Sequence, residues 1–317
     1  MRVCLMIEGQ EDVTWEQWLA LAGACEAAGL EGLFRSDHYS SVFGILERGS
    51  LDAWTTLAGI AARTQRIRLG TLVSPATFRH PSLLARAVTT VDHISRGRVE
   101  LGLGAGWYEL EHRAHGFEFA DTRTRIARFA EQLELVHRQW TEAAFSFEGK
   151  HYSVEDCRAL PKPVQQPHPW LIVGGSAKPG TVGPAVRFAD EYNTIFAPPK
   201  VCGERRRILD EACERAGRDP ASLRLSLMTA CVVGSNEAEL RVRAERVQAR
   251  MGQTGDAGEL LAANRDSWIA GTVEQVVDRL GELADAGVER VMLQHLAHED
   301  LDMVALIGAE IVPRVSA

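Results

Sequence analysis

Residues 99–109, VELGLGAGWYE, combine a strand pattern with alternating glycines. The first half of this stretch, Val99 to Leu103, predicts a short buried strand, and the alternating glycines that follow let the backbone approach a flat ligand closely. The spacing is not G-x-G-x-x-G, and no helix pattern opens directly behind it, so a Rossmann phosphate loop is disfavoured. A ligand-facing strand end and a purely structural glycine-rich strand end both remain open at this point.

Seven further strand patterns flank this one, and nearly all are followed by a helix pattern. We expect the strands at Val3–Ile7, Glu31–Arg35, Ile67–Val73, Val99–Leu103, Trp170–Val173, Tyr192–Phe196, Leu223–Val233 and Val288–Leu293. Alternating strands and helices without a composition break predict a parallel sheet of the α/β class, and eight repeats favour closure into a (β/α)8 TIM barrel with insertions. The rival is an open, doubly wound sheet. We expect a single domain over residues 1–317, with a hairpin insertion over residues 144–154.

Composition and charge exclude several classes of protein. The chain has 317 residues and a formal net charge of −8, so it lacks the basic footprint of a nucleic-acid-binding protein. No apolar run approaches the ~20 residues that span a bilayer, and Met1–Ile7 is too short for a signal peptide. The six cysteines include no C-x-x-C pair, which fits a reducing compartment. We therefore expect a cytoplasmic protein that binds neither nucleic acid nor membranes.

Functional side chains of such a barrel lie at the carboxyl ends of its strands. Ser36-Asp37-His38 follows the second expected strand. The imidazole of His38 can exchange a proton near neutral pH, and Asp37 could orient it or bind a cofactor hydroxyl. The alternative is that Asp37 caps the next segment and His38 is an ordinary loop residue.

Two more strand ends carry candidate residues. Thr71 and Leu72 lie in the third expected strand, where it runs into a proline-containing loop. Gly174-Gly175-Ser176 follows the fifth strand and precedes a helix pattern, and free N–H groups at a helix N-terminus bind phosphate well. A plain turn explains this last segment equally well. His112 and His115 have no third ligand near them in the sequence, so we expect no zinc site.

Taken together, these segments resemble the luciferase-like monooxygenase family, specifically its F420-dependent branch. The motifs are SDH (36–38), RIRLGT (66–71), FRHP (78–81), GRVELGLGAGWYE (97–109), GGS (174–176), ADEYN (189–193) and GTV (271–273). Each motif is weak alone, but their order and spacing cover nearly the whole chain.

The resemblance implies a TIM barrel, often a homodimer, with a deazaflavin or flavin ring across the barrel mouth. It places Asp37 and His38 at the ring, and it implies a non-prolyl cis peptide bond between Thr71 and Leu72. The other cofactor residues that it implies are Gly104, Ala105, Gly106, Tyr108, Gly174, Gly175 and Ser176. Many relatives have Asn at the position of Tyr108, so a side-chain amide contact is not carried over there.

The function that this resemblance implies is hydride transfer between F420 and a small, hydrophobic organic substrate, because the coenzyme performs the difficult step. We assign His38 as the acid/base, with Asp37 as its partner or as a contact of the coenzyme ring. Glu109 is a further catalytic candidate, since the related sugar-phosphate dehydrogenases carry a glutamate after the glycine run. The alternatives are an FMNH2-dependent monooxygenase and a non-catalytic flavin-binding barrel. An F420 or flavin reductase is the expected redox partner.

Overall fold

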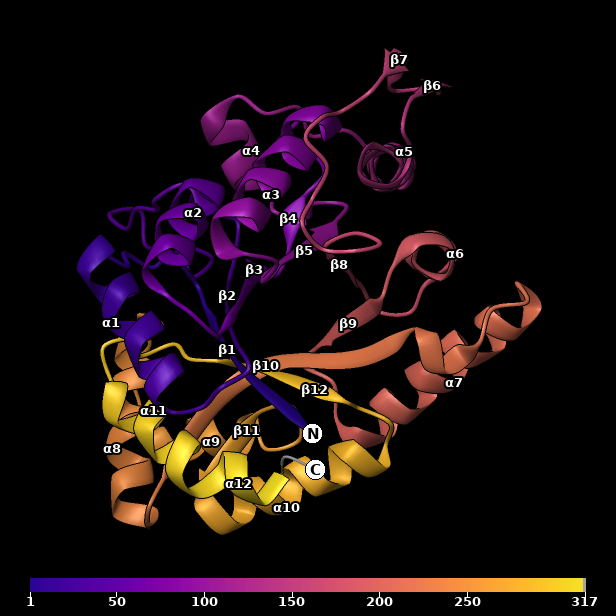
Figure 1. Ribbon diagram of the computed structural model, residues 1–317. Coiled ribbons are helices and arrows are strands. Elements are labelled where there is room, and N and C mark those ends of the chain that lie inside the picture. Colours follow the sequence, from indigo (N-terminus) through magenta and orange to yellow (C-terminus); the bar gives the residue numbers. More distant parts are fainter. Residues whose placement is uncertain (316–317) are drawn as a thin grey trace.

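Eight parallel strands close into a barrel in the computed structural model, which describes residues 1–315 (Figure 1). In order around the barrel they are β1 (Arg2–Ile7), β2 (Gly32–Arg35), β3 (Arg68–Thr71), β5 (Val99–Gly104), β8 (Trp170–Gly174), β9 (Glu191–Ile195), β10 (Arg224–Gly234) and β12 (Arg290–Gln294). β12 pairs with β1, which closes the ring. The predicted TIM barrel is confirmed, and the open doubly wound sheet is excluded.

Helices surround the barrel because strands buried on both faces need an apolar cover. They are α1 (Trp15–Ala27), α2 (Ala53–Arg63), α3 (Pro81–Ser95), α4 (Glu109–His115), α5 (Thr122–Thr141), α6 (Pro179–Phe188), α7 (Pro199–Arg215), α8 (Glu237–Arg250), α9 (Ala257–Ala263), α10 (Val273–Asp285), α11 (Leu301–Leu306) and α12 (Val312–Val315). A 3-10 turn, Pro220–Ser222, and a π turn, Ile307–Ile311, complete the helical segments. None of the helices within residues 1–315 has the length and apolar character needed to cross a bilayer.

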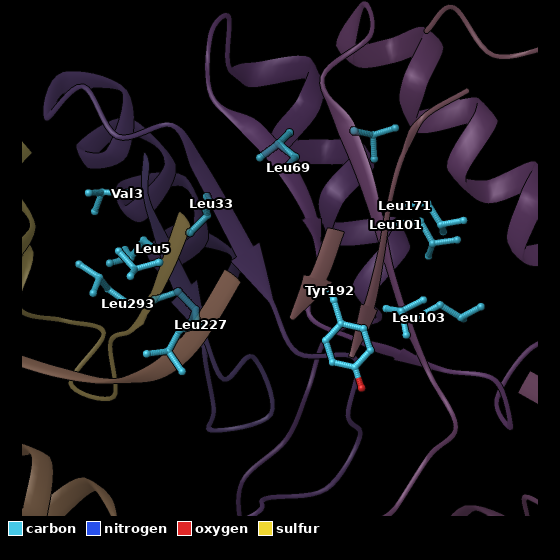
Figure 2. Packing of buried hydrophobic residues seen from close by; sticks show 14 of the residues in the cluster. Val3, Leu5, Leu33, Leu69, Leu101, Leu103, Leu171, Tyr192, Leu227 and Leu293 are labelled. Carbon is cyan, nitrogen blue, oxygen red and sulfur yellow. The ribbon is translucent and has the colours of Figure 1, made fainter. Parts of the chain in front are cut away.

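The strand residues alternate between two apolar cores. Leu5, Leu33 and Leu293 pack in the core between strands and helices (Figure 2). Met6 and Phe34, the next residues along β1 and β2, belong to a smaller cluster of the opposite strand face. This period of two is what a pleated strand requires, and it turns every second residue of each strand toward the barrel interior.

A buried ion cluster fills the amino-terminal end of the barrel. The Arg290 Nη1 atom lies 2.7 Å from Glu100 Oε2 and 3.1 Å from Glu191 Oε2, and all three side chains are almost fully buried. Buried charges are tolerated only when they are paired in this way. The cluster plugs one end of the barrel, so the opposite end remains for a ligand.

Two segments differ from the sequence-based expectation. The third strand ends at Thr71 instead of Val73, and the chain rejoins the sheet as β4 (Ser74–Pro75) beside β5. The cis peptide bond joins Leu72 and Val73, one residue later than the resemblance implied. The expected hairpin is present as β6 (Phe145–Glu148) and β7 (Ser153–Cys157), and β11 (Ile269–Thr272) pairs with β10 outside the barrel.

Candidate active site

A cavity of about 780 Å³ opens at the carboxyl ends of the barrel strands. One wall consists of residues that the sequence had marked as cofactor-binding: Leu72, Gly104, Ala105, Gly106, Gly174, Gly175 and Ser176. They come from the ends of β3, β5 and β8, which are neighbours in the barrel. The structure therefore brings together segments that are about 100 residues apart in the sequence, as the strand-end rule requires.

The glycines of this wall make room for one side chain. A Cβ atom on Gly104 would lie 2.7 Å from Cγ2 of Val73, and one on Gly174 would lie 3.2 Å from its Cγ1. A Cβ on Gly102 would meet the backbone oxygen of Thr71 at 2.1 Å. Gly102 and Gly104 therefore leave room for the Thr71 backbone and the Val73 side chain, and Gly174 packs tightly against the same valine, even before any ligand is considered.

His38 lines the cavity and is hydrogen-bonded to a carboxylate that the sequence had not singled out. Its Nδ1 atom lies 2.6 Å from Oε1 of Glu111, on α4. Burial opposes protonation of the imidazole, but the hydrogen bond to Glu111 and the negative charges of Glu111, Glu8 and Asp37 raise the pKa of His38 above its ordinary value. The Nε2 atom makes no hydrogen bond within residues 1–315, so it remains available to a ligand.

Asp37 is not the partner of His38, contrary to the sequence-based assignment. Its Oδ2 atom accepts hydrogen bonds from Oγ of Ser74 at 2.6 Å and from Nη1 of Arg79 at 2.5 Å. The side chain is fully buried and does not line the cavity. Consecutive residues of an extended segment point to opposite sides, so His38 faces the cavity and Asp37 faces the loop behind it.

Three other expected site residues also lie outside the cavity lining. Glu109 is exposed and 3.8 Å from Arg113 on the same helix. The Tyr108 hydroxyl donates a hydrogen bond to the backbone oxygen of Ser41 at 2.9 Å. The Thr71 hydroxyl donates one to the backbone oxygen of Gly102 at 3.0 Å. Because α4 begins at Glu109, a residue two positions later lies on the other side of the helix. Glu111 faces His38 for this reason.

Sequence reasoning missed Glu8 and Gln294, which lie at the ends of β1 and β12. Glu8 is 8% exposed and lines the cavity. Its Oε1 accepts a hydrogen bond from Nε2 of Gln294 at 2.5 Å, and its Oε2 accepts one from Nε2 of Gln10 at 2.8 Å. The strand-end rule would have found both residues, had it been applied to the first and last strands.

The remaining walls are mostly apolar. They include the apolar residues Val42, Phe43, Met228, Met251, Trp268 and Leu296, together with the polar residues Asn193, Asn264 and Ser267. Two aromatic residues, Trp107 and Phe196, also line the cavity, and Trp107 lies edge-on to His38 with ring centroids 5.7 Å apart. Such a lining suits a largely apolar ligand.

The expected phosphate cradle has fewer free donors than the sequence suggested. The Gly175 N–H already donates to the backbone oxygen of Asn193 at 3.0 Å, and the Ala177 N–H donates to the Tyr192 hydroxyl at 2.9 Å. The N–H groups of Ser176 and Lys178 have no acceptor within residues 1–315. Lys178 is also the N-cap residue of α6, so an anion there would meet two free N–H groups and a helix N-terminus. No group of three potential metal ligands occurs in the same described part of the chain.

Comparison with known proteins places the chain among luciferase-like enzymes. The family model described as luciferase-like monooxygenase matches residues 3–290. An F420-dependent glucose-6-phosphate dehydrogenase from Nakamurella multipartita is 29% identical over 94% of this chain and 91% of the relative. A protein of the same name from Kineococcus radiotolerans is 34% identical, and that match spans about half of each protein: 53% of this chain and 48% of the relative. A pyrimidine monooxygenase from Pseudomonas syringae is 33% identical over 57% of this chain and 51% of the relative.

Solved structures agree on the fold. The monooxygenase RslO1 from Streptomyces bottropensis has a TM-score of 0.84 at 23% identity, and the comparison covers both chains completely. An F420-dependent secondary alcohol dehydrogenase in complex with an F420–acetone adduct has a TM-score of 0.82 at 18% identity, covering 100% of this chain and 99% of that one. The barrel, its strand-end cavity and the match over residues 3–290 lead to one conclusion: this chain belongs to the luciferase-like monooxygenase family.

Proposed function

We propose that this protein is an F420-dependent oxidoreductase that transfers a hydride between F420 and a small, hydrophobic organic substrate. The observation that carries the proposal is the His38–Glu111 pair in the wall of a largely apolar cavity, beside the glycine strand ends. The relatives named F420-dependent glucose-6-phosphate dehydrogenase support the choice of coenzyme.

The residues present fit a flat coenzyme that ends in an acidic group. The cavity volume lies within the ~300–1,000 Å³ range of small-molecule sites. Leu72, Val73 and the glycine strand ends would hold the ring, and the N–H groups of Ser176 and Lys178 would hold a phosphate. When bound, F420 supplies a carbon that accepts or releases a hydride.

The side chains of this protein supply the proton transfer. Glu111 accepts the hydrogen bond of Nδ1–H, which fixes the tautomer of His38 and leaves Nε2 facing the cavity. A neutral His38 takes the hydroxyl proton when the substrate is oxidised, and a protonated His38 returns it in the reverse direction. The apolar walls exclude water and hold the substrate in place.

Titration of the purified protein with F420 and with FMN tests the coenzyme. We expect F420 to bind with a micromolar or lower Kd, about −8 kcal/mol, and to quench the fluorescence of Trp107, which lines the cavity. Binding of FMN, but not of F420, at tens of micromolar would contradict the proposal.

The second function to test is that of an FMNH2-dependent monooxygenase, which the pyrimidine monooxygenase relative favours. A flavin reductase would then be the redox partner, and turnover would consume oxygen. An F420-dependent enzyme would instead need an F420-reducing or F420-oxidising partner. Oxygen uptake with reduced FMN and none with reduced F420 would favour the monooxygenase.

A homodimer in the cytoplasm is part of the same proposal, and it rests on the family resemblance. Light scattering at micromolar protein concentration measures the mass directly. A mass twice that of the 34.8 kDa chain supports the homodimer, and a monomer mass contradicts it.

A further inference from the structure

The cavity has a polar corner with two carboxylates, formed where three neighbouring strands end. Glu8 follows β1, Gln294 ends β12, and His38 follows β2. The Ser36 hydroxyl donates to Oε1 of Gln10 at 2.5 Å, and Gln10 in turn donates to Glu8. Two amide groups of this corner, those of Gln10 and Gln294, therefore donate to the Glu8 carboxylate, while the His38 imidazole pairs with Glu111.

The Glu8 carboxylate still has capacity to accept hydrogen bonds. Each of its oxygens accepts one amide N–H, from Gln294 and Gln10, while an ionised carboxylate offers about four acceptor positions. Neither Lys nor Arg forms an ion pair with it within residues 1–315. Because this carboxylate is 8% exposed and lines the cavity, a ligand in the cavity can supply a further donor to it.

Acidic side chains outnumber basic ones in the cavity lining. The lining contains two carboxylates, those of Glu8 and Glu111, and one imidazole, that of His38, but no Lys or Arg. Asp37 is nearby but is neutralised by its ion pair with Arg79. An anionic group placed at this corner would meet two like charges in surroundings of low polarity, where charges interact strongly.

We propose that Glu8 determines the substrate class: the reacting end of the substrate is a hydrogen-bond donor without negative charge, an alcohol or amine carried on an apolar body. The donor group lies against Glu8 and His38, and the apolar body packs against Phe43, Met251 and Trp268. This inference rests on the proposed function only in taking the cavity as the substrate site. It argues against an anionic substrate at this corner, such as the sugar phosphate in the relatives' name.

Binding of four matched compounds tests the proposal by calorimetry, on the full chain with and without F420. 1-Phenylethanol is a neutral donor, 1-phenylethylamine a cationic donor, acetophenone an acceptor only, and 2-phenylpropanoate an anion. We expect the alcohol and the amine to bind at least tenfold more tightly than acetophenone and the anion. Equal or tighter binding of the anion, or no binding of the alcohol at millimolar concentration, would overturn the proposal.

Two variants assign the selectivity to Glu8. Glu8→Gln removes the charge, and Glu8→Met keeps the side-chain length if the glutamine variant does not fold. Either should reduce the ratio of alcohol to anion affinity by about tenfold or more. The control Glu16→Gln removes the same charge from an exposed position on α1 and should leave the ratio within twofold. An unchanged ratio in a folded Glu8 variant contradicts the proposal.

The F420 titration separates this inference from the proposed function. If wild-type protein does not bind F420 but its alcohol selectivity depends on Glu8, the proposed function fails and the role of Glu8 stands. If F420 binds and the Glu8 variants keep the wild-type ratio, the role of Glu8 fails and the proposed function stands.

Discussion

Nδ1 of His38 lies 2.6 Å from Oε1 of Glu111, although the two residues are 73 positions apart in the chain. The other oxygen of Glu111 accepts the backbone N–H of Tyr39 at 2.9 Å. The carboxylate therefore holds both the imidazole and the backbone that carries it. This arrangement joins the segment after β2 to the helix that follows the glycine run, and it sets the orientation of the one imidazole that lines the cavity within residues 1–315.

His38→Ala should lower turnover by about 10²–10⁴-fold, because a positioned acid/base is removed. The affinity for F420 should stay within a few-fold, since the glycine wall and the α6 end are untouched. Steady-state kinetics and a coenzyme titration measure the two quantities. A collapse of F420 affinity would instead make His38 a binding residue.

Glu111→Gln should shift the pH profile of the reaction. Glu111 is the main group that raises the pKa of His38, while burial lowers it, so removing the charge should lower that pKa. In the direction that oxidises substrate, His38 must be neutral, and the rising limb of the rate should therefore move to lower pH. The maximal rate should fall as well, because the orientation of the ring is lost.

The matched change Glu109→Gln distinguishes the two glutamates of α4. Glu109 is exposed and pairs only with Arg113 within the described residues, so we expect a pH profile like that of the wild type. If Glu109→Gln lowered turnover as much as Glu111→Gln does, Glu109 would take part in catalysis, as the sequence analysis expected.

Gly104→Ala should weaken coenzyme binding, because the new Cβ would lie 2.7 Å from Cγ2 of Val73 and force it out of place. The control is Gly23→Ala, since a Cβ at this α1 position meets no atom within 4 Å. That change should stabilise the protein by about 0.5–1 kcal/mol, as expected for alanine in a helix. Thermal melting and F420 titration check both variants; equal F420 affinity in the two would contradict the role given to Val73.

Ser176→Glu should weaken F420 binding at least tenfold, because it places a carboxylate beside the two free N–H groups at the start of α6. Gly175→Asp is a poorer test, since a Cβ there would lie 2.3 Å from the buried Tyr192 hydroxyl and disturb packing. An unchanged F420 affinity for a folded Ser176→Glu protein would move the phosphate site elsewhere.

Acid should destabilise the protein through the half-buried His137, whose imidazole stays neutral in the folded state. Burial, together with the neighbouring His168, lowers the pKa of His137 to about 4. The unfolded chain takes up the proton near the ordinary pKa of about 6.5. The contribution of His137 to stability therefore falls as the pH falls from about 6.5 to about 4, and it is constant below that range. His137→Gln should flatten the dependence of melting temperature on pH over this window, and the exposed His115→Gln should not. A wild-type slope in the His137 variant would contradict this.

The barrel could be predicted from the amino-acid sequence alone. The eight strand–helix repeats could be recognised because apolar periodicity is a local property, which depends on residues a few positions away. The strand-end rule then located the glycine wall, from Leu72 through Gly104 to Ser176, and it also located His38. It would have extended to Glu8 and Gln294, since they too end strands.

The side-chain pairs of the site became evident only from the three-dimensional structure. Asp37 stands next to His38 in the chain, yet Ser74 and Arg79 bind it on the opposite side of the segment. Glu111 reaches His38 because one short helix, α4, turns it inward and turns Glu109 outward. The strand-end glycines Gly104 and Gly174 likewise pack against Val73, a residue of another segment. Such pairings depend on long-range packing between barrel segments, which no local pattern encodes, whereas strand and helix periodicity is set by the backbone itself.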